Sequence, residues 1–253
     1  MRWTQAAIQS IQRGSAQLLD FCFPRRCLLC EQEETLADTD SSLCLPCQQK
    51  LVVDSPQCAR CAANVGPYVD ASVDCVQCRG DRFAFEQVIS LGIYQDELRT
   101  ACLRAKLSSG QPLIRGLVES LETHRRPVLD RWRPDLIIPV PHHWWERLTR
   151  RHLSPLTMAE ALAARLRCPV RFDLLAKCKS TEKQALLPRS RRWDNMRGAF
   201  RIAGGTQFSG ASILLVDDVM TSGATAHECS RALKAAGAAH IYVAVLARAQ
   251  VGR

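Results

Sequence analysis

The sequence of 253 residues predicts an α/β protein, with a parallel sheet covered by helices on both faces and a small cysteine-rich module before it. Two observations lead to this prediction. After residue 82, apolar strand-like segments alternate with amphipathic helix-like segments, which is typical of a parallel sheet buried on both sides. Before that point, eight cysteines recur in four CxxC pairs among polar residues.

The elements of the sheet domain follow from the runs and spacings of apolar residues. Strands are expected at Gln87–Ile93, 135–140, 213–216 and 241–247. Helices are expected at 96–106, 113–124, from 154 to at least 166, and at 224–236. Ser154 is expected to cap its helix with Pro155 in the first position, and Gly237 to end the last helix. A hydrophobic content of 47% is sufficient for a buried core.

The chain is expected to have three parts: an N-terminal helix over 1–22, a zinc-binding module with two four-cysteine sites over 23–82 and the sheet domain over 83–253. In the first part Ile8, Ile11 and Leu18 recur at helical spacing, but there is no continuous apolar core, so this part does not resemble a secretory signal. No apolar run approaches the roughly 20 residues that span a bilayer. We therefore expect a cytoplasmic protein without a membrane span.

The CxxC pairs form an internal duplication. In each half two pairs are separated by thirteen residues, and the second half repeats the first at an offset of 31 residues. Two such pairs can present four thiolates to one tetrahedral zinc ion. The expected ligands are Cys27, Cys30, Cys44, Cys47, Cys58, Cys61, Cys75 and Cys78.

Zinc is favoured over two other roles for these cysteines. Disulfides need an oxidising compartment, and four pairs at a fixed period do not resemble one redox dithiol. The segments between the pairs are polar, so two structural zinc ions would supply most of the folding free energy of the module. The simplest pairing gives one ion to each half. A cross-braced arrangement would use the same residues in alternating pairs, and the spacing fits both.

The segment 212–226 (SILLVDDVMTSGATA) has the features of a sugar-phosphate site. An apolar strand leads into two adjacent carboxylates, Asp217 and Asp218, which can accept hydrogen bonds from ribose hydroxyls. A loop of small and hydroxyl residues follows and opens a helix, whose positive end favours a bound anion. The expected loop ligands are Thr221, Ser222, Gly223, Ala224 and Thr225. An ordinary strand followed by a capped helix is the alternative interpretation.

The net charge of +9 favours polyanionic partners, either pyrophosphate or a nucleic-acid backbone. Basic residues gather in two stretches, 147–151 and 177–201. Solvated surface charge is the ordinary explanation for such stretches, and charge alone does not favour DNA over it. Contacts with pyrophosphate or DNA are expected from Arg147, Arg150, Arg151, Arg191 and Arg192.

The segment 213–225 resembles the phosphoribosyl-pyrophosphate (PRPP) signature of type I phosphoribosyltransferases. Together with the eight cysteines, it makes the chain resemble the ComF family of competence proteins from about Phe23 to Arg248. The segment 139–151 (PVPHHWWERLTRR), the stretch 103–106 and the segment 179–200 add to the likeness. The matching residues of the last segment are Thr181, Gln184, Leu187, Arg191, Asn195, Gly198, Ala199 and Phe200.

The resemblance implies a type I phosphoribosyltransferase-like fold and a part in DNA uptake during natural transformation. It also implies PRPP or a related phosphoribosyl ligand, magnesium bound with PRPP, contact with single-stranded DNA and partners in the competence machinery. An active phosphoribosyltransferase with an unidentified base acceptor and a non-catalytic, zinc-scaffolded adaptor are the alternatives. The intact loop counts against the adaptor. The sequence identifies no catalytic residue, and fold and motif do not establish turnover.

Overall fold

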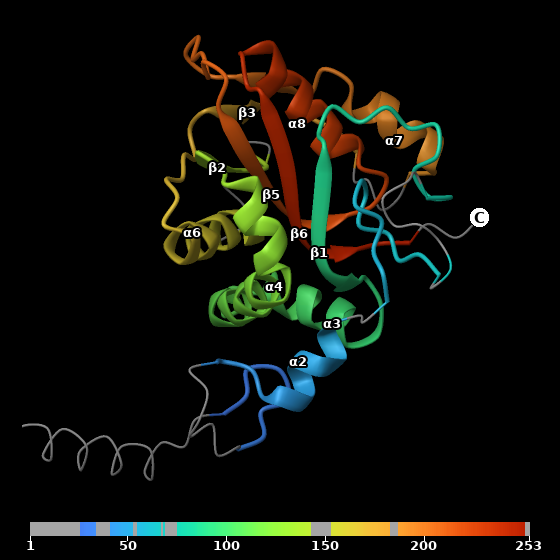
Figure 1. The fold of residues 1–253 in the computed structure, drawn as a ribbon, viewed down its shortest axis with the longest axis vertical. Helices are drawn as coiled ribbons and strands as arrows, with labels where there is room; N and C mark the ends of the chain where they lie inside the picture. The colour runs from blue at the N-terminus through green and yellow to red at the C-terminus, as the bar shows by residue number, and fades with distance from the viewer. Residues whose placement is uncertain are drawn as a thin grey trace, which may run out of the picture.

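The computed structural model describes residues 26–33, 41–52, 55–66, 68, 75–142, 153–182 and 187–250. Its centre is a four-stranded sheet (Figure 1). In spatial order the strands are β1 (Gln87–Ile93), β6 (His240–Arg248), β5 (Ser212–Met220) and β2 (Leu136–Pro139). All neighbouring strands are parallel, so the predicted fold class is confirmed.

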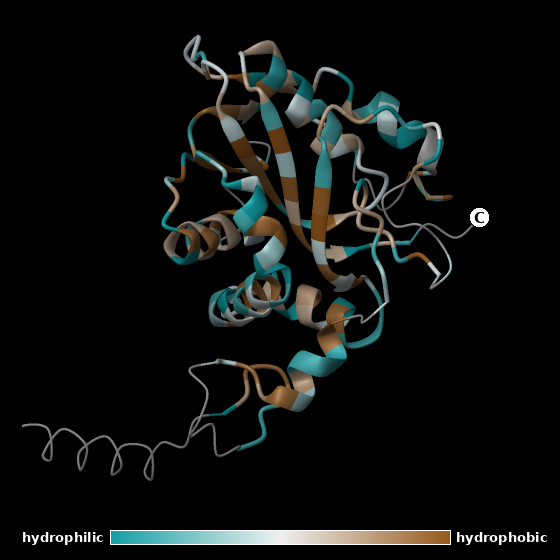
Figure 2. Cartoon of the chain, in the orientation of Figure 1, coloured by the Kyte–Doolittle hydropathy of each residue, from teal (hydrophilic) through white to brown (hydrophobic). Residues whose placement is uncertain are grey.

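Helices cover both faces of this sheet. One face packs against α3 (Asp96–Ala105), α4 (Gln111–Trp132) and α6 (Ser154–Leu166). The other packs against α8 (Ala224–Ala235), α7 (Arg189–Met196) and a small antiparallel sheet of β3 (Leu175–Lys177) and β4 (Phe200–Ile202). Along β5, Leu214 joins the first core and Leu215 the second. Because both of its faces are buried, β5 has an unbroken apolar run, and Figure 2 shows hydrophobic colour along this strand.

Helix α4 is longer than predicted. The expected end at residue 124 is wrong, because the helix continues through Pro127 to Trp132. Proline removes one backbone hydrogen bond from a helix and normally bends or ends it. The last turn is held by burial: Trp132 stacks on Tyr242 with ring centroids 4.5 Å apart and donates its indole N–H to Gln87 Oε1 at 2.8 Å. Tertiary packing of Trp132 therefore outweighs the tendency of Pro127 to end the helix.

Two other boundaries differ from expectation. Leu153, and not Ser154, is the N-cap of α6, and Ser154 lies buried within the first turn. Strand β5 extends beyond Val216 to Met220, because its pairing with β6 continues that far. The acidic pair therefore lies within a paired strand and not after one.

The predicted helix over 1–22 and the domain boundaries remain predictions, because residues 1–25 lie outside the described part of the chain. Within the described ranges, no helix combines the length and apolarity that a bilayer crossing requires.

The two halves of the cysteine-rich segment share one backbone conformation. We call residues 26–33 and 41–52 the first cysteine unit, and residues 55–66 and 75–81 the second. Arg26 forms an antiparallel bridge with Glu33, and Gln57 forms the equivalent bridge with Asn64, 31 residues further on. The turn residues with positive φ repeat at the same offset, Glu31 at 63° and Ala62 at 55°. The duplication seen in the sequence is therefore a structural duplication.

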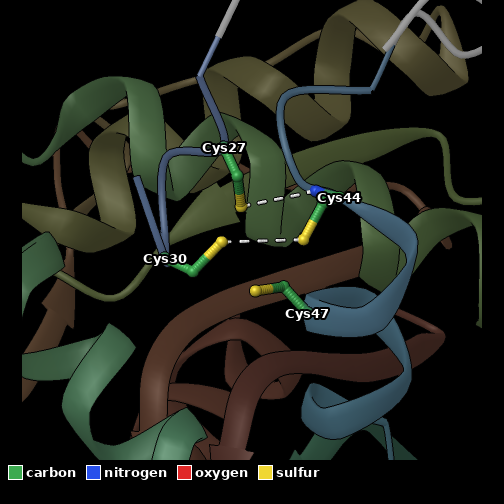
Figure 3. Close-up of side chains that lie close together, drawn as sticks. All are labelled: Cys27, Cys30, Cys44 and Cys47. Atoms are coloured by element: carbon green, nitrogen blue, oxygen red, sulfur yellow. Dashed lines mark hydrogen bonds between the residues drawn. The ribbon is translucent and has the colours of Figure 1, made fainter. Parts of the chain in front are cut away.

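Each unit brings its own four cysteines together, and Figure 3 shows the first set. The sulfur atoms of each set lie within 4.8 Å of one another. Individual Sγ–Sγ distances of 3.5–3.9 Å match the roughly 3.8 Å of tetrahedral zinc with Zn–S bonds of about 2.3 Å. The sets are Cys27, Cys30, Cys44, Cys47 and Cys58, Cys61, Cys75, Cys78, which is the simple pairing and not the cross-braced one. Two structural zinc ions fit these sites.

The first cysteine unit docks on the helices of one sheet face. Arg104 of α3 donates to the carbonyls of Leu28 and Leu29 at 3.3 and 2.6 Å and pairs with Glu31 at 2.9 Å. The helix α2 (Leu45–Leu51) of this unit lies beside α3 (Figure 1). The unit therefore holds the C-terminal end of α3.

The second cysteine unit docks on the edge of the sheet. The amide of Val88 in β1 donates to the carbonyl of Ala59 at 3.2 Å, and the Ser90 hydroxyl to Gln57 Oε1 at 3.3 Å. At the end of β6, the buried Arg248 donates from Nε to the carbonyl of Cys61 at 2.8 Å. This unit therefore covers β1 and holds the end of β6.

We expect purified protein to contain two zinc ions per chain, and Cys27→Ser and Cys58→Ser each to remove about one. Cys58→Ser should lower the melting temperature more, because every cysteine of the second set is buried whereas Cys30 of the first set is exposed. Metal analysis of protein prepared without chelators and thermal unfolding test this. Cys178→Ser, at an exposed cysteine outside both sets, is the control. Zinc-free protein with oxidised CxxC pairs would contradict the prediction.

Candidate functional site

A crevice opens at the carboxyl end of the sheet because β2 stops before β5. Their pairing ends where Pro139 lies opposite Val216, followed by a hydrogen bond of 2.8 Å from the Val140 amide to the Val216 carbonyl. Beyond this point β5 continues its pairing with β6, as far as Met220 opposite Arg248, and among the described strands it has no second partner there. The next described helix after β2 is α6 on one face, and the helix after β5 is α8 on the other. Ligands of open α/β sheets bind at such a divergence.

The acidic pair lies in this crevice. Asp217 Oδ1 accepts the amide of Asp218 at 2.9 Å, and Asp218 Oδ1 accepts the amide of Val219 at 2.7 Å. These bonds orient both carboxylates. Burial, followed by the charge of Asp218, raises the pKa of Asp217 to about 8. Burial and the neighbouring charge therefore favour the protonated form of Asp217 in the free protein.

Lys106 reaches the pair from the end of α3. Its Nζ lies 2.9 Å from Asp218 Oδ2. Burial alone would lower the pKa of Lys106, but the charge of Asp218 and the hydrogen bond to it raise that pKa, so the ammonium is retained. The carboxylates thus already have a positively charged partner contributed by another part of the chain.

The loop 221–225 follows β5 directly. Gly223 has φ of +84°, a backbone conformation that favours glycine, and an added Cβ would lie 2.8 Å from Met220 Cε and 3.0 Å from Phe83 Cε1. Ser222 is buried and its Oγ lies 3.4 Å from the Ala224 amide, next to the start of α8. Thr221, Gly223, Ala224 and Thr225 line a cavity, whereas Ser222 is not among its lining residues.

Arg248 supports the loop from beneath. Besides Cys61, its guanidinium donates to the carbonyl of Met220 at 3.1 Å and to the carbonyl of Thr221. Because a trans peptide places C=O and N–H on opposite sides, a Thr221 carbonyl that faces Arg248 directs the next amide away from that guanidinium. One buried side chain therefore connects the second cysteine unit to the loop.

Two cavities flank Asp217 and Thr225, which line both of them. The larger, of about 280 Å³, is also lined by Tyr94, Lys106 and Asp218. The smaller, of about 160 Å³, lies toward the end of β2. Its lining includes Pro141, His142, Lys177, Thr181 and Phe200. The crevice thus has two compartments that meet at one carboxylate.

The described residues of the segment 179–200, singled out by the resemblance, shape the smaller compartment, while Gln184 lies outside the described residues. The Asn195 side chain bonds the backbone of Glu182 twice, at 3.1 and 3.0 Å, and so holds the segment that carries Thr181. The amide of Gly198 donates to Glu228 of α8 at 2.9 Å. Asparagine and glycine therefore have positioning roles here.

The basic residues predicted to contact pyrophosphate or DNA are placed only in part. Arg147, Arg150 and Arg151 lie outside the described residues. Arg191 is exposed on α7, while Arg192 is half-buried and donates from Nε to the Leu187 carbonyl at 2.9 Å. Neither α7 arginine lines the two cavities.

The prediction of site residues missed Lys106, Tyr94 and Lys177. Lys106 belongs to the stretch 103–106 that contributed to the family resemblance, and Lys177 to a basic stretch, so a weak signal existed for both. Nothing in the sequence indicated Tyr94. All three come from elements distant in sequence from the acidic pair, and only the folded sheet brings them to it.

The acidic pair has oxygen ligands of the kind that magnesium prefers, but it provides only two carboxylates. Magnesium is commonly held by one or two carboxylates together with substrate phosphates. Within the described residues, only the two cysteine sets bring together three or more groups able to hold a metal. A magnesium ion at this site would therefore need oxygens from a bound ligand.

Comparisons with known proteins agree with this architecture. The family model of the double zinc ribbon domain matches residues 18–79, and that of the phosphoribosyl transferase domain matches residues 155–253. Competence protein F of Haemophilus influenzae is 27% identical over 90% of this chain and 98% of its own. The DNA utilization protein YhgH of Escherichia coli O157:H7 is 26% identical over 89% of this chain and 97% of its own.

Among solved structures, a purine phosphoribosyltransferase from Pyrococcus horikoshii Ot3 is 20% identical, with a TM-score of 0.34, over 62% of this chain and 78% of its own. The resemblance to the ComF family is confirmed by the two matched domains and by the similarity that extends over both. The chain is a homologue of competence protein F and of YhgH that joins a double zinc ribbon domain to a phosphoribosyltransferase domain.

Proposed function

We propose that this chain binds PRPP or a related phosphoribosyl ligand in the crevice and that it acts in DNA uptake. The observation that carries the proposal is the position of the acidic pair. Asp217 and Asp218 lie where β2 and β5 diverge, beside the loop 221–225, which we call the anion loop. The phosphoribosyltransferase domain contains both features. The adaptor alternative leaves a cavity of about 280 Å³ at this site without a role.

Each part of the site has a distinct task in this proposal. The loop amides and the start of α8 bind the 5′-phosphate, because unpaired N–H groups and the helix dipole favour an anion. Asp218, oriented by the Val219 amide, accepts hydrogen bonds from the ribose hydroxyls, and Asp217 contributes on the side of the smaller compartment. Magnesium accompanies PRPP as the counter-ion of its pyrophosphate.

Turnover is the second candidate function. Transfer would break the bond between C1 of the ribose and pyrophosphate and form a bond from C1 to an acceptor. The smaller compartment, of about 160 Å³, adjoins Asp217 and offers a place for an acceptor or for pyrophosphate. Pyrophosphate release from PRPP, measured with a panel of bases and single-stranded DNA, separates turnover from binding alone.

The proposed role in DNA uptake rests on the relatives called competence protein F and DNA utilization protein. We extend it to direct contact with single-stranded DNA, because the net charge is +9 and the segment from β3 through α7 to β4 carries several exposed cations. These cations are Lys179, Arg191, Arg197 and Arg201. A cytoplasmic location, where thiols stay reduced, and partners in the competence machinery belong to the same proposal.

Replacing both carboxylates, Asp217→Asn with Asp218→Asn, should weaken PRPP binding at least tenfold. Charge-assisted hydrogen bonds are worth roughly 1.5–3 kcal/mol each, and about 1.4 kcal/mol corresponds to tenfold in affinity. Calorimetry with PRPP and magnesium measures the change, and zinc content with a melting curve shows that the variant is folded. Equal affinity of variant and wild type would contradict the assignment.

The acidic pair should also make the ligand-free protein less stable at higher pH. The pKa of Asp217 is about 8 in the folded protein against an ordinary value of 3.8, so the favoured folded form is protonated. Its stabilising contribution is complete below about pH 4 and is lost as the pH rises through about 8. Between pH 6 and pH 9, the melting temperature of wild type should therefore fall relative to Asp217→Asn.

Asp135→Asn is the matched control for this pH series, because Asp135 accepts the Ser212 amide at the opposite end of β5. A difference between wild type and Asp217→Asn that stays constant with pH would show that Asp217 is ionised in both the folded and the unfolded protein.

Charge reversal in the segment from β3 through α7 to β4, Arg191→Glu with Arg201→Glu, should weaken binding of single-stranded DNA whatever its base sequence. If each arginine contacts one phosphate, the dependence of log affinity on log salt should fall by about two. Fluorescence anisotropy over a salt series measures both effects. Arg115→Glu with Arg131→Glu, exposed on α4, changes the net charge equally and is the control. If both double variants lost the same affinity for single-stranded DNA, the effect would come from overall charge and not from a specific contact surface.

A further inference from the structure

We propose that Lys106 is a built-in cation of the phosphoribosyl site: it takes the place beside Asp218 that a magnesium ion would otherwise fill, and makes sugar-phosphate binding there independent of magnesium. The inference rests on the proposed function and names a residue outside the matched phosphoribosyl transferase segment, 155–253. The observation behind it is the contact of 2.9 Å between Lys106 Nζ and Asp218 Oδ2, within the cavity that the loop also lines.

The position of Lys106 is fixed by the fold. Lys106 follows the last residue of α3, and its amide bonds the Leu103 carbonyl at 3.2 Å. The chain then turns back so tightly that a Cβ on Gly110 would lie 2.4 Å from the Ala105 carbonyl oxygen, which requires glycine there. Arg104 ties the same helix end to the first cysteine unit. A lysine held in this way differs from a freely moving surface lysine.

The negative charges of the carboxylate and of an incoming sugar phosphate are the reason for a cation beside Asp218. A sugar phosphate brings negative charge toward the Asp218 carboxylate, and the repulsion must be offset. The loop amides and the helix dipole act at the phosphate end. Among the described residues that line the larger cavity, Lys106 is the one with a positively charged side chain, and it touches the carboxylate assigned to the ribose. An ammonium at Asp218 Oδ2 supplies the positive charge that a metal ion would supply.

Asp218 can accept a sugar while Lys106 stays in place. One oxygen accepts the Val219 amide and the other accepts Lys106, but a carboxylate has about four acceptor positions in total. Ribose hydroxyls can therefore bond the same oxygens. A simple structural ion pair is the alternative, since exposed pairs contribute little to stability. The two interpretations differ in whether removal of the lysine creates a need for magnesium.

Ribose 5-phosphate is the probe that separates them, because it has the 5′-phosphate and hydroxyls but lacks the pyrophosphate that binds magnesium. Calorimetry of wild type with this probe, in magnesium-free buffer without chelators and in millimolar magnesium, should give affinities within about threefold of each other. Lys106→Met should bind at least tenfold more weakly without magnesium, and magnesium should restore much of the loss, since the metal can then occupy the vacated place.

Three variants complete the experiment. Lys106→Arg keeps the charge and should keep magnesium independence. Lys106→Gln, which retains a polar side chain, replaces the methionine variant if that protein folds poorly. Lys234→Met is the matched control: Lys234 pairs with Glu86 at 2.7 Å, and its side chain is 37% exposed, as is that of Lys106. The control should bind ribose 5-phosphate like wild type in both conditions.

The failures are distinguishable. If Lys106→Met binds ribose 5-phosphate like wild type with the same response to magnesium, Lys106 is only a structural partner and the inference is overturned. A wild-type protein that already requires magnesium as strongly as Lys106→Met overturns it as well. If wild type binds neither ribose 5-phosphate nor PRPP in either condition, the proposed function itself fails.

Discussion

The difference in length between β5 and β2 is the constraint on which the site depends. β2 leaves the sheet at Pro139, opposite Val216, while β6 keeps β5 extended to Met220. The acidic pair falls in the stretch that is paired on one side and open on the other. The backbone there is held by a ladder of hydrogen bonds, so two carboxyl groups can be kept close together, and burial with the neighbouring charge raises the pKa of Asp217.

The duplicated cysteine units brace this site from two directions. The first holds the end of α3 through Arg104, two residues before the lysine that contacts Asp218. The second holds Arg248, which in turn holds the carbonyls at the base of the anion loop. The two copies of the duplicated unit thus support different parts of the site: the first supports the helix end that carries Lys106, and the second supports the loop 221–225. Each cysteine unit is thus connected to the proposed ligand site through one arginine, Arg104 for the first unit and Arg248 for the second.

Much of the fold and part of the site could be predicted from sequence, because the strongest signals are local. The run into Asp217 and the CxxC pairs are contiguous, and their chemistry follows from residue type and spacing. The course of α4 past Pro127 could not be predicted, because the burial of Trp132 against Tyr242 is a contact between distant segments. Lys106 was missed as a site residue for the same reason. Its partner Asp218 lies more than a hundred residues further along the chain.

Strand β1 ends the sheet on one side, and such a strand carries unpaired backbone groups that invite another chain. Here the backbone of the second cysteine unit meets it, as the bond from Val88 to Ala59 shows. The sequence of β1, QVISLGI, is mostly apolar and has no charged residue, which are the properties of strands that self-associate. If loss of zinc unfolded the second cysteine unit, it would therefore uncover this edge, and we expect zinc-depleted chains to associate through β1.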